Sequence, residues 1–344
     1  MWTGLPEPTA NVMRFLAPLF ALLAWASAST LLFEPLSDEE IFYINNLSGA
    51  TWKAGRNFYP HELARVKRML GVNMAENMEY NRLHQTLKDI QVTGELPDNF
   101  DPRTKWPSCP SLNEVRDQSN CGSCWAFGSA EAITDRICIK GGGQVHISAE
   151  DVNDCCKSCG DGCNGGFPAG VYSWYVKQGI VTGGQYGTNQ GCKPYSLPHC
   201  DHHTTGKYKP CTGDAKTPAC HTACREGYNK TYTEDKRKGS SAYGIEGVEK
   251  IMQDLVDNGP VTAAFTVYSD FLSYKSGVYK HTTGEELGGH AVKILGYGVE
   301  NNVKYWLVAN SWNEDWGDKG FFKILRGTDE CGIESEISAG EPKV

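Results

Sequence analysis

The chain has 344 residues, which is enough for one large domain or two packed subdomains. Its formal net charge is −8, and no basic run is longer than Lys236-Arg237-Lys238. This acidic balance argues against a nucleic-acid partner.

The first 28 residues are typical of a secretory signal. An apolar run follows Arg14 over residues 15–26, and it is shorter than the roughly 20 residues that a membrane span needs. Ala26-Ser27-Ala28 resembles a cleavage site. The alternatives are a buried hydrophobic helix and, for the start of the protein, Met13 in place of Met1. We expect export into the secretory pathway, to a lysosome or to the extracellular space or gut lumen, without a membrane span.

Residues 29–95 contain no cysteine and predict two short helices. The first follows the capping box Ser37-Asp38-Glu39-Glu40, and the second has apolar side chains at Leu63, Val66 and Leu70. Because the segment has little apolar content, we expect it to dock on the rest of the chain. We also expect acid to weaken that docking by protonating carboxylates that pair in the docked state. The candidate carboxylates are Glu34, Asp38, Glu39, Glu40 and Glu62.

The remainder predicts an α+β fold, because helical patterns come first and strands come later. The predicted helices run from Ser123 to about Lys140 and from about Val248 to Asn258. Residues 183–243 are rich in Gly, Pro, Cys and His and predict disulfide-pinned loops. The predicted strands are Val261–Val267, Ala291–Tyr297, Tyr305–Ala309 and Phe321–Leu325.

All fourteen cysteines lie between Cys109 and Cys331. Together with an export signal, this density indicates an oxidising compartment and a disulfide framework. A zinc site at Cys155-Cys156-x-x-Cys159-x3-Cys163 is the alternative, but no second ligand pair follows it. The tripeptides that begin at Asn46 and Asn229 predict glycosylation.

Cys124 is a candidate nucleophile, because it lies in the first turn of a predicted helix. A helix N-terminus and a nearby imidazolium would both lower the pKa of the thiol. The alternatives are that Cys124 forms a disulfide or that Cys121-x-x-Cys124 is a redox motif, although the βαβ context of such a motif is absent.

Three more residues complete a machinery for thiol acyl transfer. His290 would take the proton of Cys124 and later protonate the leaving amine, and Asn310 would accept a hydrogen bond from the imidazole. Gln118 and the backbone N–H of Cys124 would hold the oxyanion. Each residue alone has an ordinary structural interpretation, so the assignment depends on finding all four together.

These segments resemble the papain family of cysteine proteases and, within it, the cathepsin B type. The matching segments are Gln118-x5-Cys124-Trp125-Ala126-Phe127, Cys163-Asn164-Gly165-Gly166, Gly289-His290-Ala291 and Asn310-Ser311-Trp312-Asn313. His290 follows Cys124 by 166 residues, more than the roughly 130–150 of a plain papain-like chain. Cys200-Asp201-His202-His203-x7-Cys211 resembles the occluding loop that accounts for this insertion, and Trp52-x-Ala54-Gly55-x-Asn57-Phe58 resembles a short propeptide of the same type.

The resemblance implies a papain-like two-subdomain fold, with a helical left half and a β-barrel-like right half. It divides the chain into a signal peptide (1–28), an inhibitory propeptide (29–95) and a peptidase domain (96–344) with an occluding loop at about 200–211. The implied protein is a monomeric zymogen with endopeptidase and peptidyl-dipeptidase activity and no metal or other cofactor. Its implied partners are peptide and protein substrates, its own propeptide and cystatin-type inhibitors. The main rival interpretation is a catalytically dead relative, and the four intact residues weigh against it. A disulfide-rich adhesive module without a cleft is the second, and reaction with a thiol-directed epoxide would separate both rivals from the enzyme.

The resemblance also implies roles for individual residues. Glu336 would let the pocket for the second residue before the scissile bond accept Arg, His202 and His203 would hold the substrate's C-terminal carboxylate, and Trp312 would shelter the Asn310–imidazole contact. The implied substrate-binding residues are Gly165, Gly166, Phe167, Pro168, Ala291, Trp312, Glu336, His202 and His203. The implied disulfides are Cys109–Cys138, Cys121–Cys163, Cys155–Cys220, Cys156–Cys159, Cys192–Cys224 and Cys200–Cys211, with Cys124 and Cys331 free.

Two features depart from the family's pattern. Cys156 and Cys159 enclose two residues where three are usual. Tyr208 stands where the family often has an Arg that pairs with the Asp matching Asp315, although the His202–Asp117 match is retained. Lys207 or Lys209 could substitute for that Arg, but Lys cannot form a bidentate fork. We therefore expect a loop that is held less firmly than usual.

Overall fold

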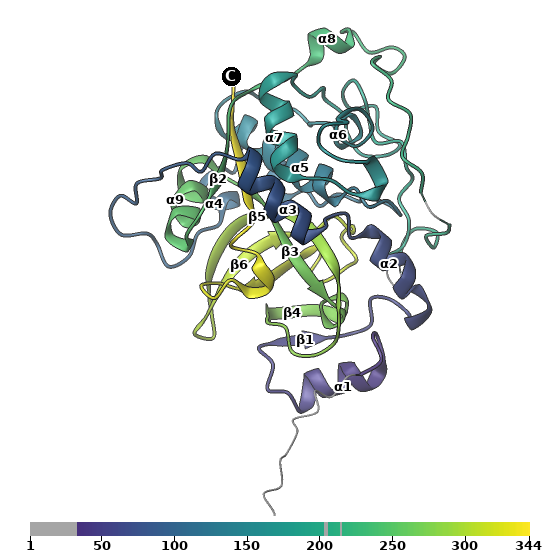
Figure 1. Cartoon of the computed structure of the whole chain (residues 1–344), viewed down its shortest axis with the longest axis vertical. Helices are drawn as coiled ribbons and strands as arrows, with labels where there is room; N and C mark the ends of the chain where they lie inside the picture. The colour runs from purple at the N-terminus through teal and green to yellow at the C-terminus, as the bar shows by residue number, and fades with distance from the viewer. Residues whose placement is uncertain (1–32, 203–205, 214) are drawn as a thin grey trace, which may run out of the picture. The chain divides into compact units, whose positions relative to one another are not determined.

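The structure is a computed structural model that describes residues 33–202, 206–213 and 215–344, and these residues belong to one compact unit (Figure 1). The predicted signal peptide and His203 lie outside the described residues. Within the described part of the chain, no helix has both the length and the apolar character to cross a bilayer.

One eight-stranded sheet forms the β half, in the order β1-β4-β7-β6-β5-β3-β8-β2. Only the β4–β7 pair is parallel among these neighbours. The four predicted strands are confirmed as β3, β5, β6 and β7, although β5 begins earlier than predicted because its first residues include two glycines and carry no apolar alternation. The strands are β1 (Trp52–Ala54), β2 (Gly239–Ile245), β3 (Val261–Tyr268), β4 (Tyr274–Tyr279), β5 (Glu286–Glu300), β6 (Val303–Ala309), β7 (Phe321–Leu325) and β8 (Ile337–Pro342).

The helical half is built around α5 (Cys124–Ile139), which packs against β5 and β8 and confirms the first predicted helix. The second predicted helix is confirmed as α9 (Val248–Asn258). Buried ion pairs join α5 to its neighbours: Arg136 contacts Asp254 of α9 at 2.5 Å, and Lys293 of β5 contacts Asp135 at 2.8 Å. The other helices of this part are α4 (Pro102–Lys105), α6 (Ala149–Cys155), α7 (Pro168–Lys177) and α8 (Tyr232–Asp235).

The prediction that residues 183–243 are all loop is wrong at its end, where α8 and most of β2 lie. The first residues of β2, Gly239-Ser240-Ser241, have no apolar alternation, and the strand is formed because its backbone pairs with β8. The structure contains six disulfides, Cys109–Cys138, Cys121–Cys163, Cys155–Cys220, Cys156–Cys159, Cys192–Cys224 and Cys200–Cys211. This is the pairing that the resemblance implies, and it leaves Cys124 and Cys331 free.

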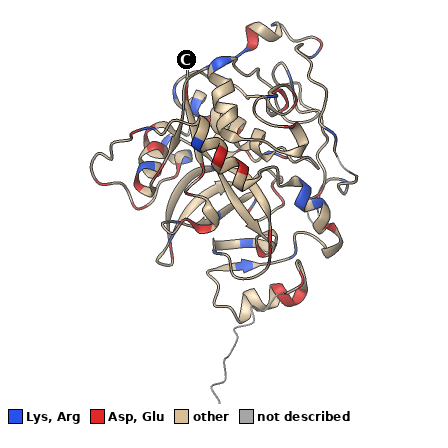
Figure 2. Cartoon of the chain, in the orientation of Figure 1, with Lys and Arg blue, Asp and Glu red and all other residues tan. Residues whose placement is uncertain are grey.

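The propeptide segment packs on the rest of the chain through α1 (Asp38–Asn46), β1, α2 (Leu63–Met69) and α3 (Met74–His84). Ser37 caps α1 as predicted by accepting a hydrogen bond from the Glu40 N–H, but Glu40 turns inward and does not complete the capping box. Helix α3 was not predicted, because Asn77 is its one buried residue and it carries no apolar face. Figure 2 marks acidic residues at the start of α1 and basic residues along α2.

The aromatic propeptide motif fastens the segment to the sheet. Strand β1 adds to the edge of β4, and the Asn57 side chain donates to the carbonyl oxygens of Leu272 and Tyr274, both at 2.9 Å. Phe58 packs edge-on against Trp312, with ring centroids 5.9 Å apart. Helix α3 contacts α7 of the helical half and β3 of the sheet, so it lies across the boundary between the two halves.

Candidate active site

Cys124 is the first residue of α5, and its sulfur is fully buried under the propeptide. The sulfur accepts a hydrogen bond from the backbone N–H of Gly71 at 3.2 Å. Burial raises the pKa of the Cys124 thiol to about 11, against smaller lowering effects of N–H donors from Ala291, Gly71 and Trp125. The raised pKa belongs to this propeptide-covered state, because the covering segment excludes the water and the charge that would stabilise a thiolate. The low thiol pKa expected of the reacting enzyme stays a prediction.

His290 lies on β5 and Asn310 directly follows β6, so two adjacent strands bring them together. His290 Nε2 is 2.8 Å from Asn310 Oδ1, and His290 Nδ1 has no hydrogen-bond partner among the described residues. The Trp312 ring lies 4.8 Å from the imidazole ring, where it shelters this contact from water. Burial lowers the pKa of His290 to about 4, so the imidazole is neutral here.

Gln118 holds a carbonyl oxygen of the propeptide. Its Nε2 donates to Met69 O at 2.9 Å and to Cys121 O at 2.7 Å. The Ser311 hydroxyl donates to Gln118 Oε1 at 2.7 Å, which fixes the orientation of the amide. A preorganised donor of this kind can stabilise an oxyanion, and the propeptide places a neutral carbonyl oxygen at that donor.

The propeptide backbone passes very close to the walls of the cleft. Gly71 O accepts from Gly166 N at 3.0 Å, and Val72 exchanges backbone hydrogen bonds with Gly289 at 3.0 and 3.1 Å. A Cβ atom at Gly71 would overlap the Gly122 carbonyl oxygen, so only glycine fits this crossing. Gly165 has a φ of 118°, a conformation that favours glycine.

Glu336 lies just before β8 and is buried beneath α3. Its Oε2 accepts hydrogen bonds from Asn77 at 2.7 Å and Asn81 at 2.6 Å. Burial raises the pKa of this carboxyl, against the lowering effect of the two amides. A cavity of about 540 Å³ beside it is lined in part by Asn81 and Ile337.

The remaining predicted pocket residues lie around the same crossing. Phe167 stacks on Tyr80 of α3, with centroids 4.4 Å apart, and Pro168 is the first residue of α7. Ala291 is buried and directs its backbone N–H at the Cys124 sulfur. The structure therefore brings Gly165, Gly166, Phe167, Ala291 and Glu336 against the propeptide segment that covers Cys124.

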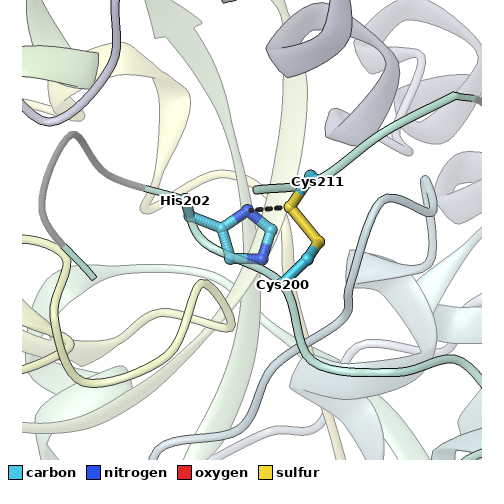
Figure 3. A group of neighbouring side chains, drawn as sticks. All are labelled: Cys200, His202 and Cys211. Atoms are coloured by element: carbon cyan, nitrogen blue, oxygen red, sulfur yellow. Dashed lines mark hydrogen bonds between the residues drawn. A yellow bond between two sulfur atoms is a disulfide. The ribbon is translucent and has the colours of Figure 1, made fainter. Parts of the chain in front are cut away.

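The occluding-loop segment is anchored by a histidine–carboxylate contact. His202 is buried, and its Nε2 lies 2.8 Å from Asp117 Oδ1. Its Nδ1 lies 3.8 Å from the sulfur of Cys211, next to the Cys200–Cys211 disulfide (Figure 3). Because both sulfurs are joined to one another, they are not available as the thiolate ligands that a metal site needs.

A neighbouring lysine only partly replaces the Arg that the family often has at the position of Tyr208. Lys207 Nζ is 3.7 Å from Glu314, and both side chains are largely exposed, so this contact is weak.

The predicted glycosylation sites Asn46 and Asn229 are exposed, and their occupancy stays a prediction.

The predicted role of propeptide carboxylates in acid release is wrong for Glu40. Glu40 is buried against Ser269, and burial raises its pKa to about 7, with the nearby Asp270 adding to the rise. Asp38 pairs with Arg56 and Glu62 with Arg65, so these two ion pairs lie within the propeptide and not across its interface with the rest of the chain.

Sequence reasoning missed several residues of the site. Ser311 lies inside the quoted Asn310 motif, and its hydroxyl next to a catalytic amide was the available signal. Asn77 and Asn81 are four residues apart, which would have placed them on one face of a helix had α3 been predicted. His199, whose Nδ1 is 3.4 Å from Asp117 Oδ2, had no signal beyond its place beside Cys200.

Two protein-family models match most of the chain. A family model described as papain family cysteine protease matches residues 96–341. A second, described as peptidase family C1 propeptide, matches residues 36–75.

Named relatives agree with the family matches. A cathepsin B-like cysteine proteinase of Schistosoma japonicum is 51% identical over 312 residues, which cover 89% of this chain and 91% of the relative. Cathepsin B-like cysteine proteinase 6 of Caenorhabditis elegans is 51% identical over 283 residues, 80% of this chain and 74% of the relative. The solved structure of proCathepsin B S9 from Trypanosoma congolense has a TM-score of 0.75 and 38% identity, and the match covers 90% of this chain and 99% of that one.

Proposed function

The chain belongs to the papain family of cysteine proteases, as a cathepsin B-like zymogen, and from this premise we propose the roles of its residues. Cys124 is the nucleophile, His290 the general base and acid, Asn310 the group that orients the imidazole, and Gln118 an oxyanion donor. The observation that carries this assignment is the arrangement under the propeptide: Cys124 accepts from Gly71, Gln118 holds the Met69 carbonyl, and His290 is bound to Asn310.

The chemistry follows from that arrangement once the propeptide leaves. His290 Nδ1, which has no partner among the described residues, takes the Cys124 proton as the sulfur attacks the peptide carbonyl carbon. The carbonyl oxygen becomes an anion where the Met69 oxygen now lies, and Gln118 donates to it. The imidazolium then protonates the leaving amine, and water hydrolyses the thioester by the reverse proton transfers.

The test compares the two free cysteines. Cys124→Ala should abolish peptidase activity of the matured protein, whereas Cys331→Ala should keep it, because Cys331 lies outside the cleft machinery. A thiol-directed epoxide should label the wild type once and Cys124→Ala not at all. Substantial activity in Cys124→Ala would overturn the assignment.

We infer further that the substrate pocket accepts Arg at the second residue before the scissile bond. Glu336 Oε2 now accepts hydrogen bonds from the side chains of Asn77 and Asn81, and a guanidinium offers donors that can replace both amides on this carboxylate. Glu336→Ala should lower kcat/KM about ten- to a hundredfold for a substrate with Arg at this position. The same variant should change a Phe substrate little, and a parallel fall for both would assign Glu336 a structural role.

We propose that the enzyme is a peptidyl-dipeptidase as well as an endopeptidase. His203, with His202, would grip the substrate's C-terminal carboxylate, while the His202–Asp117 contact keeps the loop in place. His203→Ala should reduce dipeptide release from a peptide with a free C-terminus and spare its C-terminal amide. An equal effect on both peptides would contradict the carboxylate clamp.

We also propose a monomeric enzyme of the secretory pathway, in a lysosome or in the extracellular space or gut lumen, that cystatin-type inhibitors recognise. The six disulfides support an oxidising compartment. Fractionation of expressing cells, with assay of both the lysosomal fraction and the medium, tests the destination.

A further inference from the structure

We propose that His199 and Tyr208 form a second latch for the occluding loop, built on the same carboxylate, Asp117, that holds His202. The proposal rests on the peptidyl-dipeptidase function proposed above, because a latch matters for specificity only if the loop closes the leaving side of the cleft. Both residues would be positioning residues, since they act on the substrate through the loop.

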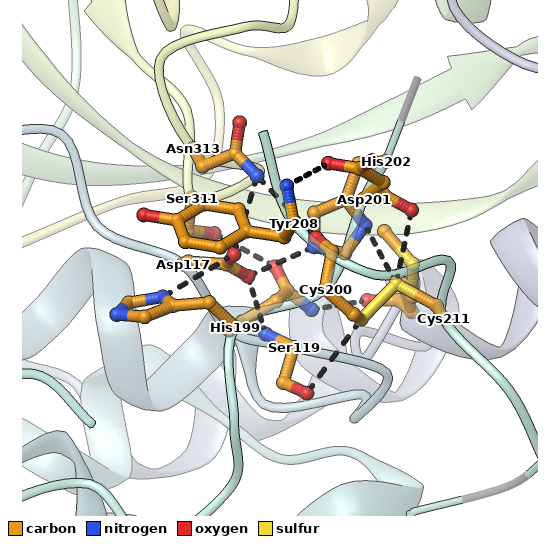
Figure 4. Close-up of polar contacts among 12 residues, drawn as sticks. Asp117, Ser119, His199, Cys200, Asp201, His202, Tyr208, Cys211, Ser311 and Asn313 are labelled. Atoms are coloured by element: carbon orange, nitrogen blue, oxygen red, sulfur yellow. Dashed lines mark hydrogen bonds and ion pairs between the residues drawn. A yellow bond between two sulfur atoms is a disulfide. The ribbon is translucent and has the colours of Figure 1, made fainter. Parts of the chain in front are cut away.

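Asp117 is a buried carboxylate with two imidazoles beside it (Figure 4). Its Oδ1 lies 2.8 Å from His202 Nε2, and its Oδ2 lies 3.4 Å from His199 Nδ1. The backbone N–H of Ser119 donates to Oδ1 at 2.7 Å, and Asn313 donates to Oδ2 at 3.2 Å. Although burial acts to raise it, the pKa of Asp117 is held well below its usual range by the two histidines and Ser119. The carboxylate therefore stays charged. It makes a hydrogen bond with His202 and a longer contact with His199, whose Nδ1 has no hydrogen-bond partner among the described residues.

Tyr208 packs on the second of these imidazoles. The ring centroids of His199 and Tyr208 are 5.0 Å apart and the rings are inclined by 21°, so they stack. Tyr186 closes the other side of His199 edge-on, at 6.2 Å and 89°. Stacked and edge-on contacts of aromatic rings stabilise beyond the area they bury.

The stack ties together the two ends of the loop. His199 immediately precedes Cys200. Tyr208 lies shortly before Cys211, which is the disulfide partner of Cys200. The backbone N–H of Tyr208 also donates to Asp201 Oδ1 at 3.0 Å, which holds the returning limb against the outgoing one. Asp117 thus fastens the outgoing limb to the body of the enzyme, and the Tyr208 ring fastens the returning limb to His199.

The stack changes the expected firmness of the loop. Without the Arg that the family often has at the position of Tyr208, the loop was expected to be held loosely, but the Tyr208 ring makes a different contact, with His199. The contact with His199 is made by the ring of Tyr208 and does not depend on its hydroxyl. The ionisable groups that contact the cluster include Asp117, His202, Asp201 and, with its Nζ 5.2 Å from the centre of the Tyr208 ring, Lys207.

The test uses the complete matured enzyme, without its propeptide, and its active sites are counted by epoxide titration. For each variant, kcat/KM for dipeptide release from a peptide with a free C-terminus is divided by kcat/KM for cleavage of the same peptide with a C-terminal amide. His199→Ala and Tyr208→Ala should each lower this ratio about three- to tenfold, through a higher KM for the free peptide. Tyr208→Phe should stay within about twofold of the wild type, and the double variant should match His199→Ala, because that change already removes the stack with Tyr208.

The outcomes separate the latch from the function on which it rests. If His202→Ala changes the ratio while His199→Ala and Tyr208→Ala do not, the latch is overturned and the peptidyl-dipeptidase function stands. If the wild type shows no preference for the free C-terminus, the proposed function fails and the latch fails with it. Tyr208→Leu, which keeps bulk without a ring, replaces Tyr208→Ala if that variant misfolds, and a ratio equal to the wild type would again overturn the latch.

Discussion

The amide of Gln118 is held at both ends, and this makes Ser311 a residue of mechanistic interest. Its hydroxyl donates to Gln118 Oε1 at 2.7 Å, while Nε2 faces the cleft. Removing the hydroxyl leaves a buried amide oxygen without that donor and frees the amide to rotate. Ser311→Ala should therefore lower kcat about tenfold, and Gln118→Ala about 10²- to 10³-fold.

Steady-state kinetics of the matured enzyme with one peptide substrate checks this prediction. The KM should change little, because the donor acts on the oxyanion and not on the bound substrate. The double variant should be no slower than Gln118→Ala alone, since Ser311 acts through that amide. An additive loss would show that Ser311 acts by another route.

The protonation of Cys124 should differ between the zymogen and the matured enzyme. Burial raises the pKa of the thiol to about 11 and lowers that of His290 to about 4 in the zymogen, so neither group is charged near neutral pH. At pH 7 a thiol with this pKa is ionised in about one molecule in 10⁴. Release of the propeptide admits water and lets the helix N-terminus and an imidazolium stabilise the thiolate.

Alkylation of Cys124 by iodoacetamide across pH measures the difference, in a Cys331→Ala background that removes the other free thiol. We expect a rate that rises only at strongly alkaline pH in the zymogen and a profile shifted by several units toward acid in the matured enzyme. Superimposable profiles would contradict the role given to the propeptide.

The proposed catalytic residues could be named from the sequence because short motifs surround each of them, and the resemblance of those motifs to a family implied their roles. The supporting residues were not readable in the same way. Ser311 and His199 act through contacts between segments far apart in the chain, such as Gln118 with Ser311 and Asp117 with His199. Such pairing depends on the tertiary fold, and one sequence carries no record of it.

Helix α3 is the element that covers the substrate pocket. Its N-cap is Asn73, whose side chain accepts from the Glu76 N–H, and the helix directs Asn77 and Asn81 at Glu336. Hydrogen bonds to a charged group contribute about 1.5–3 kcal/mol each. Asn77→Ala and Asn81→Ala should each weaken inhibition by the 29–95 segment about tenfold or more.

The inhibition constant of that segment, added to the matured enzyme, checks the prediction. Asn73→Ser is a matched control, because it keeps an N-cap side chain on α3 and makes no contact with Glu336. In a Glu336→Ala enzyme the two Asn variants should lose their effect. A weakening that persists there would mean that the variants only destabilise α3.

Elements with strong local patterns were predicted and those made by pairing were not. The apolar positions of α9 and the apolar and aromatic runs of β3, β6 and β7 carry their own signal. Helix α3 and strand β2 lack that signal, because α3 buries one polar residue and β2 is formed by pairing with β8. Their existence follows from the partner surface and not from their own residues.

At the scale of the whole molecule, the propeptide is held by contacts spread from α1 to α3. Strand β1 extends the sheet, the backbone near Gly71 fills the cleft, and α3 covers Glu336. The pH dependence of such docking is set by groups whose pKa changes on docking. Glu40 of α1 is the propeptide group with the clearest change in pKa, since its side chain is buried against Ser269.

Glu40 should oppose acid release. Its pKa is raised from 4.5 to about 7 in the docked state, first by burial, so docking takes up a proton. This contribution to affinity is fully present below pH 4.5 and is lost as the pH rises through about 7. Between those limits the wild-type 29–95 segment should therefore lose about tenfold or more in affinity relative to Glu40→Gln, whose side chain does not titrate.

Inhibition constants of the two segments against the matured enzyme from pH 4.5 to 8 measure this difference. Glu39→Gln, a change at an exposed neighbour, is the control. Parallel curves for wild type and Glu40→Gln would show that Glu40 does not titrate on docking.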